Sequence, residues 1–591
     1  MCGIAGIMRS PDAPPPDQAL GARLAAALAH RGPDGVGVHI DRQLLLVHTR
    51  LAIIDLATGA QPLFAPGGLA LIANGEVYNY RELRRAMPGV AFATASDCEP
   101  PLALFRTQGL GFTAAMRGMY ALALHDAGTR TLVLARDPFG IKPLYLAERA
   151  DGIAFASEPA ALVAAGLVPA RLNEGPRDEF LELQFSTGTA TVFAGITRLA
   201  PGEVVAIRDG RIVARRRLAA LPEGGPEAID EAAALARLDG ALMDSVAMHQ
   251  RADVPYGLFL SGGIDSAAIL AAMARLDSRP VLAFTAGFDV PEAADERAAA
   301  RAAAGAAGAR HHEITVTEAD FWAHLPAIAA AMDDPAADYA TLPTWLLARE
   351  ARRDVKVVLS GEGGDEIFAG YGRYRAAMRP WWLGGRAMRA RGILDRLGLR
   401  RDPPAAWRDG IAAAEARAAT PGRTRLMAAQ AADIAEWLPN DLLAKLDRCL
   451  MAYGVEGRTP FLDPVVAAAA FRLPDALKLR DGRGKYLLRR WLAENFPAAR
   501  PFARKQGFTV PVGAWIARQG PLLGPLVAAQ PGVAELCEPA KVKTLFAQAG
   551  AKHESFAAWT LLFYALWHRH HIEGVRGEGD VFDRLAMKGP T

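Results

Sequence analysis

A cysteine directly follows the initiator methionine, and this position suits a nucleophile. Removal of Met1 would leave Cys2 with a free α-amine beside its thiol. The reference pKa of an α-amine is about 7.7–8.0, so near neutral pH the amine can act as the general base for the thiol. A thiolate that attacks a side-chain amide also needs an oxyanion hole and groups that hold the substrate. An isolated cysteine at a frayed terminus is usually an ordinary residue, so the neighbouring motifs decide the interpretation.

A series of short motifs accompanies Cys2 along the first third of the chain. In order, they are Cys2–Ile4, His30–Asp34, His48–Asp55, Asn74–Asn79, Ser96–Glu99, Ala135–Leu144 and Phe155–Glu158. The series resembles the class II glutamine amidotransferase domain of the N-terminal-nucleophile hydrolases, over about residues 2–205. The resemblance is specific, because composition alone does not place so many motifs in one order.

The resemblance implies roles in glutamine hydrolysis for individual residues. Cys2 would be the nucleophile, and Asn74 with the Gly75 N–H would form the oxyanion hole. Arg50 offers a planar fork for the α-carboxylate of glutamine, and Asp97 can hold the α-ammonium group. The expected glutamine-binding residues are Arg50, Leu51, Ile53, Asn74, Gly75, Glu76 and Asp97.

Two glycine-rich turns later in the chain indicate a second kind of chemistry. Ser261–Ser266 (SGGIDS) follows the apolar run 254–260 and precedes a predicted helix. Backbone N–H groups, glycines and hydroxyls at a helix start form a cradle for anions, although the turn lacks the Walker A pattern. Ser360–Glu366 (SGEGGDE) follows another apolar run, 355–359. In a parallel sheet both turns would lie at the carboxyl ends of the strands, where ligands bind.

The first of these turns resembles the pyrophosphate loop of the ATP pyrophosphatases, which cleave ATP to AMP and pyrophosphate while they adenylate a substrate. Asp265 and Asp365 would then supply the carboxylate oxygens that Mg²⁺ prefers, so ATP and Mg²⁺ are the expected cofactors. The expected ATP-binding residues are Leu260, Ser261, Gly262, Gly263, Asp265, Ser266, Ala286, Ser360 and Gly361.

The two parts together resemble the glutamine-hydrolysing asparagine synthetases. Further similar stretches are Asp333–Pro335, Arg458–Asp463, Gly484–Arg489 and Arg504–Phe508. By this resemblance Glu362 takes part in forming a β-aspartyl-AMP intermediate, and Lys485 neutralises charge as pyrophosphate leaves. Ammonia released from glutamine would then displace AMP. Free ammonia is mostly ammonium near pH 7 and a poor nucleophile, so an internal route between the sites is chemically sensible.

The carboxylate acceptor stays open at this point. The run 455–463 reads VEGRTPFLD, with Gly457 and Thr459 where the family usually has bulkier residues. Aspartate is the favoured acceptor, and the alternative is a cell-envelope, polysaccharide or natural-product precursor. A non-catalytic scaffold that only binds glutamine or a nucleotide is disfavoured, because Cys2 and the other chemical residues are all present.

The elements that must position these groups change character along the chain. Up to about residue 215, short β-type runs such as 44–48, 69–73 and 120–125 favour stacked antiparallel sheets with helices. From about 229, strands alternate with helices, which indicates a doubly wound parallel sheet. This pattern, together with the resemblance, predicts an αββα N-terminal-nucleophile hydrolase domain (2–210), a linker (211–228), an α/β synthetase domain with helical additions (229–575) and a C-terminal tail (576–591).

Composition limits the partners that the chain can have. It has 591 residues, 51% hydrophobic and 22% charged, with a formal net charge of +3, which favours neither disorder nor nucleic-acid binding. Four cysteines are too few for a disulfide framework. Neither a secretory signal nor an apolar run of about 20 residues is visible, so we expect a cytoplasmic enzyme. Its expected partners are glutamine, ATP and aspartate or another carboxylate, and a homodimer is compatible with the resemblance.

Overall fold

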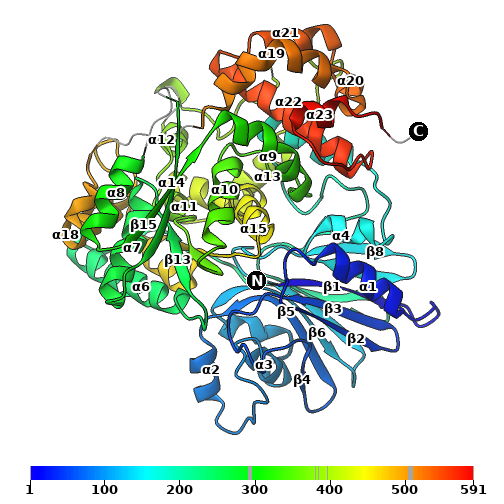
Figure 1. Ribbon diagram of the computed structural model, residues 1–591. Helices are drawn as coiled ribbons and strands as arrows, with labels where there is room; N and C mark the ends of the chain where they lie inside the picture. Colours follow the sequence, from blue (N-terminus) through cyan, green and yellow to red (C-terminus); the bar gives the residue numbers. More distant parts are fainter. Residues whose placement is uncertain are drawn as a thin grey trace.

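The computed structural model describes residues 2–290, 296–379, 381–383, 385–395, 397–503 and 510–589. Figure 1 shows an N-terminal β-rich domain in blue and cyan, an α/β domain in green, and a helical region in orange and red that ends the chain. This order of architectures confirms the predicted fold classes.

The N-terminal domain is a sandwich of two antiparallel six-stranded sheets. The first sheet has the order β10 (Thr197–Arg198), β8 (Tyr145–Arg149), β9 (Gly152–Ala156), β1 (Gly3–Arg9), β3 (Leu44–Arg50) and β2 (Gly35–Asp41). The second has the order β12 (Arg211–Arg217), β11 (Glu203–Arg208), β7 (Thr131–Arg136), β6 (Gly118–Asp126), β5 (Leu69–Val77) and β4 (Leu63–Ala65).

Apolar side chains from both sheets form the core of the sandwich. Ile4, Leu46 and Phe155 of the first sheet pack with Ile72 and Leu134 of the second. Helix α1 (Gln18–Ala27) covers the first sheet together with α4 (Pro159–Ala164), and α3 (Pro100–Gln108) covers the second. The domain therefore has the four αββα layers that the sequence predicts.

The prediction of a linker over residues 211–228 is wrong for the first part of that range. Residues 211–217 form β12, which pairs antiparallel with β11 at the edge of the second sheet. Ile212 packs against the core, and Arg215 forms a 2.5 Å ion pair with Glu203 of β11. Basic side chains are typical of an edge strand, because they discourage pairing with another chain. Sequence polarity alone therefore mistakes this strand for a linker.

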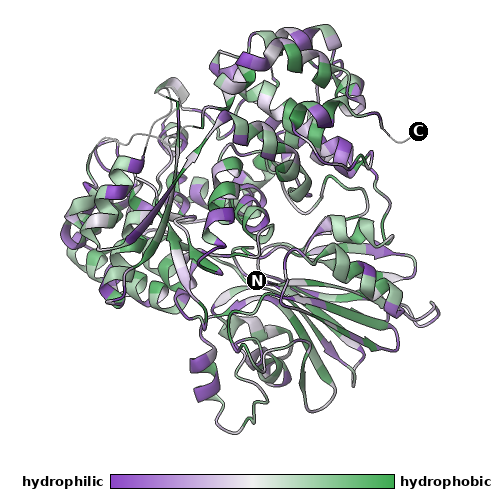
Figure 2. Ribbon diagram, in the orientation of Figure 1, coloured by the Kyte–Doolittle hydropathy of each residue, from purple (hydrophilic) through white to green (hydrophobic). Residues whose placement is uncertain are grey.

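The second domain contains a parallel five-stranded sheet with the order β15 (Arg310–Val316), β14 (Leu282–Phe288), β13 (Tyr256–Phe259), β16 (Val357–Leu359) and β17 (Glu456–Arg458). Helices α6 (Glu231–His249), α7 (Ile264–Leu276) and α18 (Tyr486–Asn495) pack on one face, and α10 (Thr341–Ala351) and α15 (Leu443–Met451) pack on the other. In Figure 2 hydrophobic residues in green predominate in the inner strands of this sheet, whereas the edge strand β15 is largely purple. The sheet is doubly wound, as predicted.

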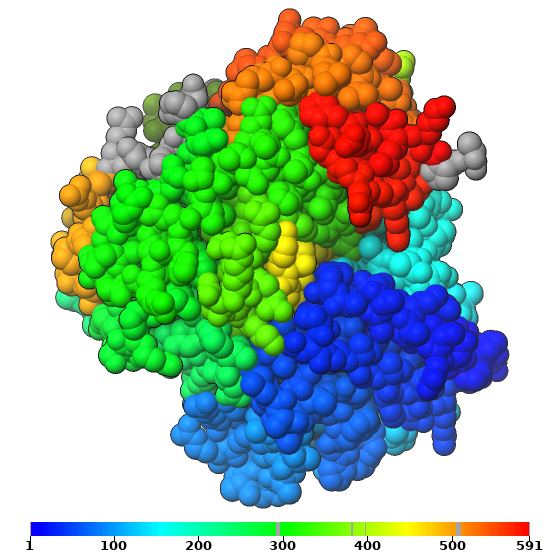
Figure 3. Space-filling view, in the orientation of Figure 1, coloured from blue at the N-terminus to red at the C-terminus, as the bar shows by residue number. Residues whose placement is uncertain are grey.

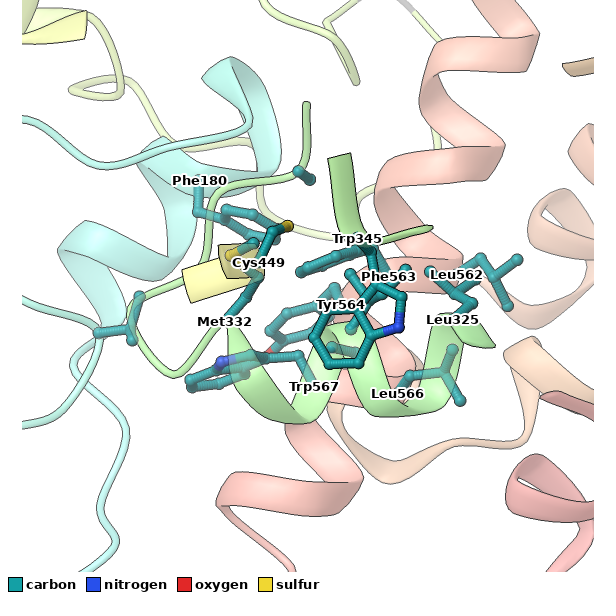
Figure 4. Close-up of a cluster of buried hydrophobic side chains, with 14 of the residues drawn as sticks. Phe180, Leu325, Met332, Trp345, Cys449, Leu562, Phe563, Tyr564, Leu566 and Trp567 are labelled. Atoms are coloured by element: carbon teal, nitrogen blue, oxygen red, sulfur yellow. The ribbon is translucent and has the colours of Figure 1, made fainter. Parts of the chain in front are cut away.

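Helices near the C-terminus pack back onto both domains. In Figure 4, Phe180 of α5 (Glu174–Leu183) lies near Phe563 and Tyr564 of α22 (Lys552–His571). The predicted tail 576–591 is not a loose extension, because it contains α23 (Val581–Ala586). Asp580 caps this helix, and Val581 and Leu585 are buried. A short helix of this kind depends on tertiary contacts, which a local pattern does not reveal.

Candidate active sites

Cys2 is held in place by the two strands next to it. It lies just before β1, where Gly3 pairs with Thr49 of β3. A side chain at position 3 would lie 2.6 Å from Thr49 Oγ1, so the close approach requires glycine. The Cys2 thiol is 3.9 Å from the carbonyl oxygen of Leu51, and burial raises its pKa. Arg31 Nε donates to the Cys2 carbonyl at 3.1 Å.

The predicted oxyanion-hole residues meet Cys2 from β5. The Cys2 backbone nitrogen donates to Asn74 Oδ1 at 3.1 Å, which fixes the orientation of the amide. Asn74 Nδ2 is buried and has no hydrogen-bond partner among the described residues. Gly75 has a φ of +154°, and a Cβ there would lie 2.1 Å from the Met119 carbonyl oxygen. An unpaired buried donor beside a cysteine is the feature that stabilises a developing oxyanion.

The other predicted glutamine-binding residues surround the same site. Arg50 ends β3, and its Nη2 donates to the Asp55 carbonyl at 2.6 Å. Leu51 and Ile53 are buried in the segment after β3. Asp97 accepts a 2.7 Å hydrogen bond from the backbone of Val77, and burial raises the pKa of its carboxyl group. Backbone pairing thus brings distant segments together around Cys2.

Glu76 of this pocket is paired with the second domain. Its Oε1 lies 3.3 Å from Arg458 Nη2 of β17, and burial raises the pKa of Glu76. Arg458 is fully buried, binds Glu456 at 2.6 Å, and donates to the His249 carbonyl oxygen at 2.8 Å. No role is predicted for Arg458 from the sequence. Its motif, Arg458–Asp463, is the signal that could have found it, because its partner Glu76 lies in a distant segment of the chain.

The predicted nucleotide loops line a cavity of about 460 Å³ at the carboxyl ends of the parallel strands. Of the predicted residues, it contains Ser261, Gly262, Gly263, Asp265, Asp365 and Lys485. Ser266 Oγ bonds to Ser261 Oγ at 3.0 Å and so stabilises the turn. Leu260 and Ala286 are buried at the ends of neighbouring strands behind the turn, outside the cavity lining.

The two predicted metal ligands converge on one lysine. Lys485 Nζ contacts Asp265 Oδ2 and lies 2.6 Å from Asp365 Oδ1. Burial opposes the lysine charge, but the two carboxylates raise the pKa of Lys485 overall. Gly364 permits this approach, since a Cβ there would lie 2.5 Å from Asp265 Oδ1. Two facing carboxylates beside an anion cradle are a donor set that fits Mg²⁺.

Glu362 lies on the second loop and belongs to a separate charged cluster. Its Oε1 is 3.6 Å from Lys445 Nζ, which is also 2.9 Å from Asp338. Burial raises the pKa of Glu362 in spite of the lysine. Ser360 and Gly361 position the loop: the Ser360 N–H donates to the Arg458 carbonyl, and Gly361 packs against Asp265.

Sequence reasoning missed several residues of this region. Lys445 is one, and Glu296, whose carboxylate accepts a 3.2 Å hydrogen bond from the Gly262 N–H, is another. Arg489 lines the cavity and lies in the Gly484–Arg489 motif, so that motif is the signal for it. The predicted family-like stretch Arg504–Phe508 lies outside the described residues.

Helix α15 physically connects the two sites. Its Lys445 faces Glu362, while Asp447 forms a bidentate pair with Arg31 at 2.8 and 3.1 Å. Arg31 in turn donates to the Cys2 carbonyl. In Figure 3 the chain coloured yellow, which includes α15, reaches the surface at the junction of the green and blue domains.

An apolar cluster also spans the two sites. It includes Leu51 and Ile53 beside Cys2, and Leu260, Leu359 and Leu462 beside the nucleotide loops.

Among the described residues, no helix is both long and apolar enough to cross a membrane.

Comparisons with known proteins find family matches for both parts of the chain. Residues 1–217 match the family model described as a glutamine amidotransferase domain, and residues 237–569 match the model described as asparagine synthase. A protein of Mycobacterium tuberculosis (strain H37Rv), provisionally named a glutamine-hydrolyzing asparagine synthetase, is 36% identical over 97% of this chain and 98% of its own.

Two further relatives carry different names. The glutamine-hydrolyzing asparagine synthetase 1 of Bacillus subtilis (strain 168) is 31% identical over 97% of this chain and 97% of its own. The amidase chyE of Penicillium rubens is 32% identical over 59% of this chain and 54% of its own. The chain therefore belongs to the glutamine-hydrolysing asparagine synthetase family, and it is an ATP-dependent glutamine amidotransferase of the ligase class.

Proposed function

We propose that the enzyme makes asparagine from aspartate: it releases ammonia from glutamine at Cys2, adenylates aspartate with Mg·ATP, and amidates the acyl-adenylate. The observation that carries this proposal is that α15 contacts both reaction centres, through Asp447 toward Cys2 and through Lys445 toward Glu362. A chain with only one working site would not need such a connection.

In the glutaminase half, the Cys2 sulfur attacks the side-chain carbonyl carbon of glutamine. Once Met1 is removed, the Cys2 nitrogen, which donates to Asn74 Oδ1 at 3.1 Å, is an α-amine that takes the thiol proton and passes it to the departing ammonia. Asn74 Nδ2 and the Gly75 N–H hold the negative oxygen of the tetrahedral intermediate. Water then hydrolyses the thioester to glutamate. Arg50 and Asp97 hold the α-carboxylate and α-ammonium groups of the substrate.

In the synthetase half, the side-chain carboxylate of aspartate attacks the α-phosphorus of ATP, and pyrophosphate leaves. The Ser261–Ser266 turn binds the phosphates, and Lys485 offsets negative charge as pyrophosphate departs. Asp265 and Asp365 would hold Mg²⁺, which supplies charge neutralisation at the phosphates when bound. Ammonia attacks the acyl carbon and AMP leaves. The family resemblance supports a role for Glu362, which is paired with Lys445, in forming the acyl-adenylate.

Ammonia must move between the two centres as the neutral, nucleophilic form. The apolar cluster that includes Leu51, Ile53, Leu260 and Leu359 supports a route through the interior, because an apolar environment disfavours ammonium. The proposed enzyme works in the cytoplasm, where glutamine and ATP are both supplied.

A different carboxylate acceptor is the second candidate. Thr459 is fully buried, and its Oγ1 has no hydrogen-bond partner within the described part of the chain. It lies directly after Arg458, whose carbonyl oxygen holds the Ser360 N–H. A free hydroxyl behind the second nucleotide loop would suit an acceptor with an extra polar group.

Product analysis tests both candidates. The purified enzyme is incubated with Mg·ATP, glutamine and aspartate, and asparagine, AMP and glutamate are measured by mass spectrometry. Equal amounts of asparagine and AMP, dependent on all three substrates, support the first candidate. Glutamate without asparagine or AMP contradicts aspartate as the acceptor and directs the search to other carboxylates.

A further inference from the structure

One end of the N-terminal sandwich carries a cluster of histidine and aspartate side chains that neither reaction uses. His39 and Asp41 lie near the end of β2, and His125 lies near the end of β6. One ligand atom from each side chain falls within 4.8 Å of the other two. The first two residues belong to the first sheet and the third belongs to the second sheet. The cluster therefore bridges the two layers of the domain.

The side chains of β2 alternate in the reverse of the pattern that an apolar core favours, with polar residues on the more buried face. Gly37, His39 and Asp41 are half-buried, and the alternate positions are exposed: Val36, Val38 and Ile40. A Cβ at Gly37 would lie 1.8 Å from the Gln61 carbonyl oxygen, and the His39 ring lies 5.4 Å from Phe64 of β4. The face that carries the polar residues is thus turned toward the second sheet. Burial alone would place the valines there.

His125 provides an independent observation. Its side chain is only 5% exposed, and Nδ1 has no hydrogen-bond partner within the part of the chain that the structure describes. The carboxylate oxygen Oδ2 of Asp41 lies 3.9 Å from this nitrogen, too far for a hydrogen bond. A buried imidazole with an unused nitrogen is suited to bind a metal ion.

The charges around the cluster permit a cation. A cavity of about 250 Å³ reaches Asp41 and His125 and is also lined by arginines. Arg9 pairs with Asp151 at 3.5 Å, and Arg130 pairs with Asp209 at 3.6 Å. Arg42 is exposed at the turn after β2. Carboxylates therefore offset the positive charges of two of these three arginines, Arg9 and Arg130.

We propose that His39, Asp41 and His125 form a binding site for Zn²⁺ that joins the two sheets. Two imidazole nitrogens and one carboxylate oxygen are a ligand set that zinc accepts, with water in the fourth position. In a tetrahedral site the ligand atoms lie about 3.4 Å apart, so small rotations of the half-buried His39 and Asp41 side chains complete the geometry. The site is separate from both reaction centres and does not depend on which carboxylate is amidated.

Zinc titration of the full-length chain tests the site. A Cys2→Ala background removes the reactive thiol, and millimolar Mg²⁺ occupies the carboxylates of the nucleotide cavity. Binding is measured by calorimetry, stability by thermal unfolding, and ligand type by the visible spectrum with Co²⁺. His39→Gln and Asp41→Asn are the test variants, because both residues are half-buried and their replacement leaves the core intact. His553→Gln, at an exposed histidine, is the matched control.

The expected result is one Zn²⁺ per chain and a higher unfolding temperature with zinc. Each test variant lowers the affinity by at least about tenfold and loses the temperature shift, whereas His553→Gln keeps both. Zinc binding that is absent, or that both test variants retain, overturns the proposal. A Co²⁺ spectrum with the charge-transfer band of a thiolate ligand also overturns it, because the site contains no cysteine.

Discussion

The two active sites satisfy their polar groups in different ways. The glutaminase site is built on and beside β-strands, and Asn74 is fully buried there with an amide nitrogen that has no hydrogen-bond partner in the described part of the chain. The nucleotide site is built on turns, and its opposite charges contact each other. Lys485 pairs with Asp265 and Asp365, and Glu296 accepts the Gly262 N–H.

The two sites differ in when negative charge arrives: during the reaction in the first site, and with the bound nucleotide in the second. In the proposed mechanism the Asn74 nitrogen would meet an oxygen that becomes negative only during the reaction, which is electrostatic preorganisation. In the proposed nucleotide site, we expect bound phosphates to displace Glu296 from the turn and to draw Lys485 away from its carboxylates. Substitutions in the first site should therefore affect the chemical step, and substitutions in the second should affect nucleotide binding as well.

The largest expected effect follows from Cys2→Ala. Loss of the only proposed glutaminase nucleophile should lower glutamine-dependent synthesis by about 10⁴-fold. Synthesis with added ammonium salts should remain, because the nucleotide site does not contact Cys2. Glutamate release and asparagine formation measure the two activities. Cys537→Ala, at another buried cysteine, is the control and should keep both; undiminished glutamine hydrolysis in Cys2→Ala would contradict the assignment.

Lys485→Met should lower pyrophosphate release by about 10³-fold, since it removes a charge that stabilises the departing group. It should also raise the KM for ATP, because Asp265 and Asp365 lose their shared cation and repel the phosphates. Glutamine hydrolysis should stay within about twofold of the original rate, since Lys485 lies outside the glutaminase site. Lys541→Met, at an exposed lysine, is the control. Normal pyrophosphate release would exclude Lys485 from the chemistry.

The sequence was sufficient where a motif is local. The strand before each nucleotide turn, the Asn74–Gly75 pair and the Asp265–Ser266 helix start all follow from short patterns, and the structure places Asn74 beside Cys2 and Asp265 beside Lys485. It was insufficient where a contact joins distant segments. Arg458 meets Glu76 and Lys445 meets Glu362 only because β17 and α15 pack between the domains. Local polarity likewise made the edge strand β12 look like a linker.

Asp447→Asn tests the connection that α15 makes between the sites. Replacing one partner of a buried ion pair should lower the free energy of unfolding by about 3 kcal/mol, because Arg31 keeps its charge. Since Arg31 also holds the Cys2 carbonyl, we expect more glutamate to form for each AMP released. Chemical denaturation and product ratios are the measurements. Asp244→Asn, at the exposed pair with Arg117, is the control, and an unchanged ratio would show that α15 only stabilises the fold.

The last effect is on stability rather than on activity, and it concerns one acid group at the end of the second nucleotide loop, Glu366. Burial, reinforced by Asp365, raises the pKa of Glu366 to about 8. The folded state then holds a proton that the unfolded state releases, so stability falls as the pH rises from about 4.5 to about 8, by at most about 1.4 kcal/mol per pH unit.

Glu366→Gln should remove this part of the pH dependence, because the amide has no proton to lose and can still accept the hydroxyl of Tyr371, which lies 2.7 Å from Glu366 Oε1. Denaturation curves at several pH values between about 5 and 8 measure the slope. Glu148→Gln, at an exposed carboxylate, should keep the original slope. Parallel curves for the original chain and Glu366→Gln would mean that the Glu366 carboxyl group is ionised in the folded state. That carboxylate would then add negative charge to the nucleotide site, beyond the charge that the observed ion pairs offset, before the nucleotide binds.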